Sequence, residues 1–403
     1  MQYFILMGII NLIKIFNKEA DMQKVYVDNS STSYPKAPGV SDAIKAFLDN
    51  TGCNFGRSSH ADSYDVAMEI LDTRQMIADL FGAQNPREVI FTPSVTYSLN
   101  MLLLGFLKKG DHVITTSMEH NAVMRPLHAL GSAGVRYTAV PCGKDGALRA
   151  DDIIPHIKKE TRALVMLHAS NVCGTVMPLE AVSEICQRHQ IKLIVDAAQT
   201  AGVLDIDARK IDALAFTGHK GLLGPGGIGG FVIKQAFAGE IAPVITGGTG
   251  SLSHEIEQPD FLPDKFESGT MNIPAILGLK RAIQYITETG VNAIHEKEMR
   301  LASAFLSEAA KIDGVRVIGK AGSQSRIAVV SLDFPGRDNA DVAHALEKNY
   351  GIITRCGLHC APSAHQTLGT YPWGTVRFSF GHLNEPDEVQ YIAQSIKEIL
   401  KKR

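Results

Sequence analysis

The sequence predicts an α/β fold in two parts: a large domain on a mostly parallel seven-stranded sheet and a small α+β domain at the C-terminal end. Between about residues 41 and 286, helix-period segments alternate with short β-branched runs, the pattern of parallel strands joined by helical crossovers. The runs are continuously apolar, as in a sheet that is covered on both faces. Beyond Pro274, two long helical patterns lead into a region with fewer strands, which predicts the second domain.

The strands and helices can be placed individually. Seven apolar runs with Pro, Gly or polar residues at their ends predict the large sheet, at 88–92, 112–116, 135–140, 163–169, 192–198, 213–217 and 229–233. Helical periodicity follows over 275–286 and 291–312. The small domain should hold strands within 315–319, 326–334 and 375–381, with helices from Asn339 and Glu385. Ligands of open α/β sheets bind beyond the carboxyl ends of the strands, so polar residues there are the site candidates.

The domain boundaries follow from these patterns and from an unusual first segment. Tyr3 to Phe16 is apolar apart from Asn11 and Lys14, yet it has no basic leader, no small-residue cleavage site and fewer than about 20 apolar residues. We therefore expect an apolar extension over 1–21, a large domain over 22–290 whose first residues pack on the small domain, and a small domain over 291–403. A helix lying on a membrane surface is the alternative for the extension, and no transmembrane span is expected.

Composition narrows the function class. The 403 residues include 40 Lys plus Arg and 42 Asp plus Glu, and 45% are hydrophobic, which excludes intrinsic disorder and collagen-like repeats. The formal charge of -2, without long runs of one sign, argues against a nucleic-acid partner. Six Cys at irregular spacing predict free thiols rather than a disulfide framework. The composition is that of a cytoplasmic enzyme.

Two residues at strand ends point to a specific chemistry. Asp196 ends the run KLIVD, and Lys220 follows the next run, ALAFT, about 24 residues later. Either residue alone is more often structural: the Asp as a cap and the Lys as a solvated surface residue. Together, on neighbouring strand ends, they are what pyridoxal phosphate chemistry requires, because the Lys binds the cofactor as a partly desolvated, near-neutral amine and the Asp keeps the pyridine nitrogen protonated.

The glycine-rich run after Lys220 imitates a different site. Gly224, Gly226 and Gly229 satisfy G-x-G-x-x-G letter for letter. A dinucleotide site needs that motif after a strand and at the start of a helix, whereas here it precedes the strand at 229–233. No acidic residue closes that strand and no Walker phosphate loop is present. The glycines therefore do not predict a nucleotide cofactor.

Several blocks in order resemble one known family. The sequences EHNA from Glu119, SNVCGT from Ser170, VDAAQ, FTGHK before a glycine-rich loop, and FESGT from Phe266 are similar to those of the class V aminotransferase and cysteine desulfurase family. The resemblance covers the chain from about Val25 to the C-terminus. It implies the fold type I architecture of pyridoxal 5'-phosphate enzymes and a homodimer.

The resemblance also implies roles for the residues that match the family's motifs. Lys220 would bind the cofactor covalently, Asp196 would contact its pyridine nitrogen, and His120 would stack on its ring. Gln199 would hydrogen-bond the phenolic oxygen. Asn171 would help to hold the substrate carboxylate.

The phosphate contacts are also implied by the resemblance, with one departure. Thr96 would bind the phosphate at the start of a helix, where free N–H groups attract anions. Thr217 and His219 would add side-chain contacts, and Thr270 would reach in from the second subunit. The family has a second Thr at the turn, where this chain has Val95, so one hydroxyl is lost.

The small domain carries a loop that resembles one group of desulfurases. The loop RCGLHCAPSAHQTLG, which starts at Arg355, is similar to the R-x-G-x-H-C-A-x-P loop of the second group, although Pro362 comes one place early. The resemblance implies that Cys360 attacks the sulfur of substrate cysteine. A cationic neighbour raises the thiolate fraction of a thiol, and Arg355 and His359 are the candidates. Arg377 matches the family's carboxylate-binding arginine, whose planar fork suits that ligand.

The resulting prediction is a cysteine desulfurase that releases L-alanine from L-cysteine and passes sulfur to an unidentified acceptor protein or thiol. Selenocysteine lyase, cystine or cysteine sulfoxide lyase, and aminotransferase are alternatives on the same fold, and a noncatalytic scaffold is an alternative of another class. Cys360 discriminates among the enzymes. The dense group Cys356, His359, Cys360 and His365 contains zinc-type ligands, but its irregular spacing argues against a structural metal.

Overall fold

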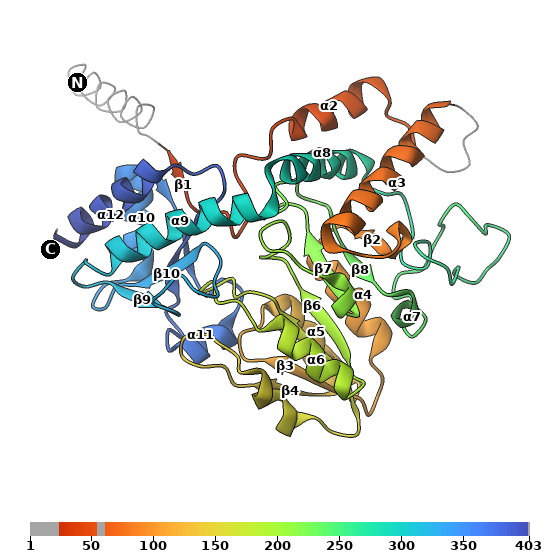
Figure 1. The fold of residues 1–403 in the computed structure, drawn as a ribbon, viewed down its shortest axis with the longest axis horizontal. Helices are drawn as coiled ribbons and strands as arrows, with labels where there is room; N and C mark the ends of the chain where they lie inside the picture. Colours follow the sequence, from red (N-terminus) through yellow and green to blue (C-terminus); the bar gives the residue numbers. More distant parts are fainter. Residues whose placement is uncertain (1–23, 55–60, 402–403) are drawn as a thin grey trace, which may run out of the picture.

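The computed structural model describes residues 24–54 and 61–401 (Figure 1). The apolar extension expected over 1–21 lies outside the described residues. None of the described helices is long and apolar enough to cross a membrane.

The large domain is built on a seven-stranded sheet, and all seven predicted strands are confirmed. The spatial order is β2-β8-β7-β6-β5-β3-β4. Their bounds are β2 Val89–Thr92, β3 His112–Thr116, β4 Arg136–Val140, β5 Thr161–Leu167, β6 Lys192–Asp196, β7 Ala213–Thr217 and β8 Gly229–Ile233. Only β8 runs antiparallel to its two neighbours, so the sheet is mostly parallel as predicted.

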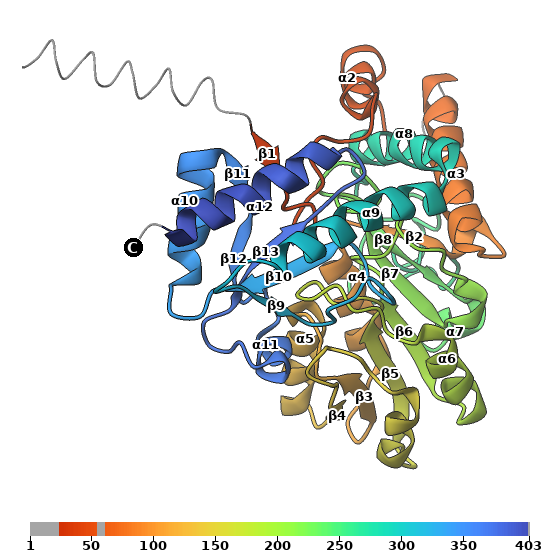
Figure 2. The same cartoon turned by 60° about the vertical axis from the view of Figure 1, so that its left-hand side comes forward.

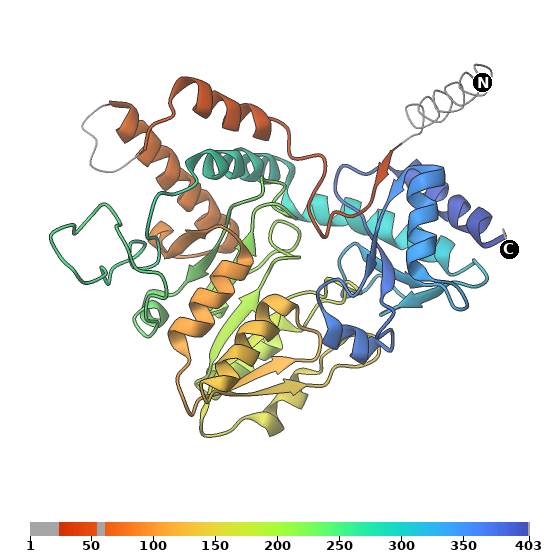
Figure 3. The ribbon, with the colours of Figure 1, turned by 180° about the vertical axis from the view of Figure 1, so that it is seen from behind.

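Six of the seven strands are buried on both faces, which explains their continuous apolar runs, whereas the edge strand β4 is largely exposed. Within β6, Leu193 and Val195 belong to one hydrophobic cluster and Ile194 to another, because successive side chains point to opposite faces. One face packs on helices α4 (Val95–Phe106), α5 (Asn121–Ser132) and α7 (Gln235–Ala238), of which α4 and α5 lie side by side in Figure 3. The other face packs on α3 (Ala61–Phe81), α6 (Leu179–Arg188) and α8 (Ile273–Thr289), with α2 (Val40–Asn50) outside α8. Short 3₁₀ helices lie at Pro86–Glu88, Ala150–His156 and Ala208–Lys210.

The small domain has a separate antiparallel sheet in the order β12-β13-β10-β9. Its strands are β9 Arg316–Ile318, β10 Val329–Asp333, β12 Arg355–Gly357 and β13 Thr375–Ser379. Its helices are α9 Val291–Ala309, α10 Asn339–Tyr350, α11 Pro362–Leu368 and α12 Pro386–Lys401. Leu301 and Phe305 of α9 join Ile392 of α12 in one core, and Figure 2 shows these helices side by side over the sheet.

The first described strand belongs with the C-terminal part of the chain. β1 (Val25–Tyr26) pairs in parallel with β11 (Ile352–Ile353), and Asp28 bridges to Ser379 of β13. The polar turn after β1 is thereby held between the small sheet and the large domain. This placement was not evident from periodicity, because both strands have only two residues.

The glycine-rich run serves close packing around β8. A Cβ atom on Gly230 would lie 2.2 Å from the carbonyl oxygen of Ile90, and one on Gly229 would lie 2.7 Å from that of Phe216. Gly227 also has a φ of 76°, which favours glycine. These glycines therefore let an antiparallel strand fit between β2 and β7.

Candidate active site

The site is assembled at the carboxyl ends of β6 and β7. Asp196 is the last residue of β6 and Thr217 is the last of β7, and the chain then continues through His219 to Lys220. The two strands pair in parallel, with Asp196 opposite Ala215, so both ends open onto the same sheet edge. Asp196 and Lys220 are close enough to interact electrostatically.

Asp196 is a buried carboxyl group, and few protein hydrogen bonds offset the cost of burying its charge. Its side chain is 4% exposed, and Oδ1 accepts one hydrogen bond, from the Ala198 N–H at 2.9 Å. Burial raises its pKa, while the Ala198 N–H and the charge of Lys220 act in the opposite direction. A buried carboxylate with one backbone donor is stabilised by a cation placed against it.

Lys220 is chemically set apart from an ordinary surface lysine. Burial lowers its pKa to about 8, and the charges of Arg377 and Arg355 act in the same direction, while Asp196 and Cys360 oppose them. At pH 7 roughly a tenth of such amines are neutral, against well under a thousandth for an unperturbed lysine. Lys220 is therefore a usable nucleophile and base near neutral pH.

His120 is held in one tautomer at the start of α5. Its Nδ1 accepts a hydrogen bond from the Ala122 N–H at 3.0 Å, so in the neutral ring the proton lies on Nε2. Burial is the main cause that lowers its pKa to about 4, and among the neighbouring charges Lys220 contributes most in the same direction. The ring is thus neutral at physiological pH and presents Nε2–H as a donor.

Glu119, which precedes His120, has a structural role that the sequence analysis did not predict. Its carboxyl accepts hydrogen bonds from the Thr116 hydroxyl at 2.6 Å and the Leu167 N–H at 2.9 Å. Burial raises its pKa to about 8. Glu119 therefore ties the end of β3 to the end of β5 and supports the turn that carries His120.

Gln199 lies beside Lys220, but its amide is turned to the N-terminal turn. Its Nε2 donates to the Ser30 carbonyl at 3.1 Å. Gln199, Lys220 and Val203 line a cavity of about 40 Å³. The structure thus brings Gln199 and Lys220 together from neighbouring strand ends.

The residues expected at a phosphate form a group with open hydrogen-bonding capacity. Thr217 Oγ1 is buried and has no hydrogen-bond partner among the described residues. Burial lowers the pKa of His219 to about 4, so its ring is a neutral donor. Thr96 is exposed in the first turn of α4, where the Ser94 side chain makes no capping hydrogen bond. The helix amides beside Thr96 are thus not occupied by that cap.

Thr270 stands apart from the other candidates. It is exposed and lines a pocket of about 290 Å³ together with Pro93 and Tyr97 of the same chain. The turn that leads into α4 therefore lies near Thr270 within one subunit.

Two arginines face each other on the small sheet. Arg355 of β12 is directly opposite Arg377 of β13, so both side chains project from one face. Arg377 is 2% exposed; its Nη2 donates to Asp28 Oδ1 at 2.7 Å and its Nη1 to the Asn171 carbonyl at 3.0 Å. Asn171 Nδ2 donates to the His359 carbonyl at 2.7 Å. The candidate carboxylate ligands Arg377, Arg355 and Asn171 are thus connected to the cysteine loop.

The loop presents Cys360 on a strained turn. His359 and Cys360 have φ values of 48° and 58°, in the left-handed region that non-glycine residues rarely adopt. The Asn121 N–H donates to the Cys360 carbonyl at 2.8 Å, which anchors the turn beside His120. Cys360 is the exposed one among six free cysteines. Local backbone strain of this kind recurs at functional sites.

One expectation about this loop is wrong: His359 does not supply a positive charge. Its side chain is 5% exposed and its Nε2 pairs with Thr375 Oγ1 at 2.9 Å. Burial holds its pKa well below the usual range, and Arg377 and His365 act in the same direction. The ring is therefore neutral, and Arg355 remains the other cationic candidate in this loop.

The other members of the Cys and His group have separate environments. His365 Nδ1 pairs with Thr370 Oγ1 at 2.7 Å, and burial raises the pKa of Cys356. Across residues 24–54 and 61–401, no group of three or more His, Cys, Asp or Glu side chains is arranged to hold a metal ion.

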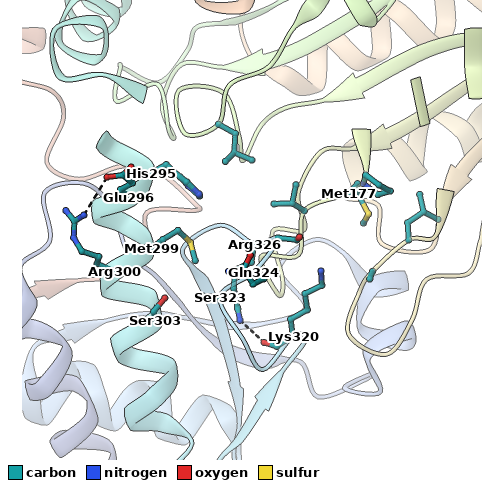
Figure 4. A pocket seen from close by; sticks show the side chains of 16 residues that line it. Met177, His295, Glu296, Met299, Arg300, Ser303, Lys320, Ser323, Gln324 and Arg326 are labelled. Atoms are coloured by element: carbon teal, nitrogen blue, oxygen red, sulfur yellow. Dashed lines mark hydrogen bonds and ion pairs between the residues drawn. The ribbon is translucent and has the colours of Figure 1, made fainter. Parts of the chain in front are cut away.

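A large cavity lies away from these residues. It has a volume of about 880 Å³ and lies between α9 and the 320–326 loop, and Lys220 and Cys360 are not among its lining residues (Figure 4). Its buried Arg326 donates to the carbonyls of Lys320 at 2.7 Å and Val329 at 2.8 Å. That guanidinium thus holds backbone together, and the candidate active site is identified by chemistry rather than by cavity size.

Comparisons with known proteins give consistent matches over most of the chain. A family model described as Aminotransferase class-V matches residues 25–392. A probable cysteine desulfurase of Methanothermobacter thermautotrophicus is 30% identical over 383 residues, covering 93% of this chain and 94% of the relative. One of Halobacterium salinarum is 32% identical, with 93% and 91% covered. The apo structure of a cysteine desulfurase from Thermococcus onnurineus NA1 superposes with a TM-score of 0.89 at 30% identity, with 94% of this chain and 95% of that chain covered.

Proposed function

Because this chain belongs to the class V aminotransferase family and has the fold type I architecture, we propose that it is a pyridoxal 5'-phosphate-dependent cysteine desulfurase. The proposed reaction converts L-cysteine to L-alanine and leaves a persulfide on Cys360. The observation that carries the proposal is the exposed Cys360, held on a strained turn beside His120 and within electrostatic reach of Lys220.

The chain's residues fit the proposed cofactor. Thr217 has a buried hydroxyl without a partner among the described residues, Asp196 has a carboxyl group that a pyridinium would neutralise, and Lys220 has an amine of lowered pKa. His219, Thr96 and the uncapped amides of α4 would complete the phosphate site. When bound, the cofactor would supply the electron sink that makes the Cα proton of the substrate acidic.

Lys220 and His120 have complementary proton chemistry for this reaction. Lys220 Nζ, with its pKa of about 8, would take the proton from the substrate Cα. His120 stays neutral and would stack on the cofactor ring. Its Nε2–H would donate a hydrogen bond to the negative charge that develops on the substrate during the reaction. Gln199 would turn from the Ser30 carbonyl to hydrogen-bond the phenolic oxygen. Arg377, Arg355 and Asn171 would hold the substrate carboxylate.

Cys360 would perform the sulfur transfer. Its thiolate attacks the substrate sulfur, the new S–S bond forms as the Cβ–S bond breaks, and a proton delivered to Cβ completes L-alanine. Enzyme thiol plus L-cysteine thus give enzyme persulfide plus L-alanine, with no external oxidant or reductant.

Incubation with one equivalent of L-cysteine should yield alanine and persulfide in equal amounts. Selenocysteine, cystine and cysteine sulfoxide, assayed in parallel, test the related lyase activities, and pyruvate formation would identify a β-eliminating lyase.

We also propose the molecular context of the reaction. The protein would act as a homodimer in the cytoplasm, where free cysteines persist, and all six of its cysteines are free. An acceptor protein or small thiol would remove the sulfur from Cys360, whose exposure permits access.

Mixed dimers test whether Thr270 serves the partner's site. Purified hybrids of a Lys220→Ala chain and a Thr270→Ala chain should contain one site with parental cofactor affinity, because the intact Lys220 and the intact Thr270 then meet across the interface. The affinity is measured by cofactor titration of hybrids isolated with two different tags. If Thr270 acts within its own subunit, as its proximity to Tyr97 would allow, the hybrid site shows only the roughly tenfold weaker binding of the Thr270→Ala parent.

The lowered pKa of Lys220 predicts the pH dependence of cofactor loading. The amine binds the cofactor aldehyde only when neutral, and a pKa of about 8 raises the neutral fraction at lower pH. The loading rate of cofactor-free protein should therefore rise about tenfold per pH unit up to pH 7.5 and level off above pH 8.5. Stopped-flow absorbance measures this rate. A rate that still climbs tenfold per unit beyond pH 9 would contradict the assignment.

A further inference from the structure

The hydroxyl of Ser31 lies between the two arginines of the site. Ser31 Oγ accepts from Arg377 Nη2 at 2.7 Å and from Arg355 Nη1 at 2.8 Å, and donates to Asp28 Oδ1 at 2.8 Å. A serine hydroxyl has one donor and two acceptor positions, and all three are used here. Ser31 comes from the turn after β1, whereas the arginines come from the C-terminal third of the chain.

The positive charges of the two arginines beside Ser31 repel each other, and the hydroxyl is an acceptor that both can share. Arg355 and Arg377 are directly opposite on neighbouring strands, where like charges repel. Asp28 forms an ion pair with Arg377 at 2.7 Å and offsets one of the two positive charges. One net positive charge therefore remains on this group. That charge matches a ligand with a single carboxylate.

The Arg377 guanidinium and the neighbouring Asn171 amide also have hydrogen-bonding groups that are not used by the described residues. Arg377 Nε and Asn171 Oδ1 are buried without partners among the described residues. Ser31 and Asp28 occupy Arg377 Nη2, and the Asn171 carbonyl occupies Nη1. The guanidinium is thus fixed from one side while its Nε–H lacks an acceptor.

We infer that Ser31 is a positioning residue that joins Arg355 and Arg377 into one receptor for the α-carboxylate of the amino-acid substrate. This inference rests on the proposed function, because it takes the substrate to be an amino acid. Without the hydroxyl, each arginine loses a hydrogen bond and the two guanidinium groups lose their shared acceptor. A fork that is not pre-organised binds a carboxylate more weakly.

The test compares ligands with and without a carboxylate in the cofactor-loaded enzyme. In Ser31→Ala, the dissociation constant of L-alanine, measured from the change in cofactor absorbance, should rise about tenfold. That of ethylamine, which is alanine without the carboxylate, should stay within about twofold. KM for L-cysteine should rise in parallel with L-alanine while kcat changes little. Ser31→Thr, which keeps the hydroxyl, should restore parental values.

Controls separate positioning from general stability. Ser395→Ala removes a hydroxyl that donates to the Tyr391 carbonyl in α12, away from the arginines, and should leave both dissociation constants unchanged. Equal weakening of ethylamine and L-alanine in Ser31→Ala, unchanged L-alanine binding, or failure of Ser31→Thr to rescue would each overturn the inference. The absorbance titration does not depend on sulfur transfer. A Ser31 effect on L-alanine binding in an enzyme that forms no persulfide would therefore uphold the inference and refute the desulfurase proposal.

Discussion

Lys220→Ala should lower the turnover of L-cysteine by at least about 10⁴-fold, because it removes both the amine that would bind the cofactor and the base that would act at the substrate Cα. The measurement is alanine production at saturating cofactor. Loss of the bound cofactor's visible absorbance band should accompany the loss of activity.

Chemical mapping of the parental protein identifies the lysine directly. Borohydride reduction followed by peptide analysis should place the pyridoxyl group on Lys220. Lys36 is the informative competitor, because burial lowers its pKa to about 8 and its Nζ lies 3.2 Å from the His219 carbonyl oxygen. A label on Lys36, or a Lys220→Ala chain that is still labelled, would contradict the assignment.

Cys360→Ala should abolish persulfide formation and lower alanine production from L-cysteine by at least about 100-fold, because the attacking thiolate is lost. Cofactor content and L-alanine binding should remain parental, since Lys220, Asp196 and Arg377 are unchanged. Mass spectrometry of the protein after one equivalent of L-cysteine measures the persulfide. Alanine is measured in the same sample.

Cys356→Ala is the matched control for this variant. Cys356 lies four residues away on β12, where burial raises the pKa of its thiol and disfavours the thiolate. Its replacement should leave persulfide formation near the parental level. If Cys360→Ala releases sulfide and pyruvate from L-cysteine as fast as the parental protein consumes L-cysteine, the desulfurase proposal is refuted. That result would favour a β-eliminating lyase, because such an enzyme needs only Lys220 and the electron sink.

The large sheet was predictable because its determinants are local. A strand covered on both faces is a continuous apolar run, and six of the seven observed strands are of this kind, while β4 at the edge of the sheet is largely exposed. The strand-end rule located Asp196 and Lys220 for the same reason, since neighbouring parallel strands end at one sheet edge. The roles of the remaining site residues came from the resemblance of ordered motifs and stay predictions.

The receptor formed by Asp28 and Ser31 with the arginines was not predictable from local patterns. Asp28 and Arg377 are separated by 349 residues, and β1 and β11 have only two residues each, too few to show a period. The sequence analysis predicted that the first residues of the large domain pack on the small domain, but nothing in the sequence identified the arginines that the turn after β1 contacts.

The order of apolar and polar segments follows from local sequence alone, and with it the sheet, its open edge and the residue types at that edge. The tertiary structure decided their charge states and their neighbours. His359 shows the difference: adjacent to Cys360 in the sequence, it would serve as a cation, yet burial against Thr375 keeps it neutral. Protonation depends on desolvation and on charges brought together by packing, and a linear sequence of residues contains neither.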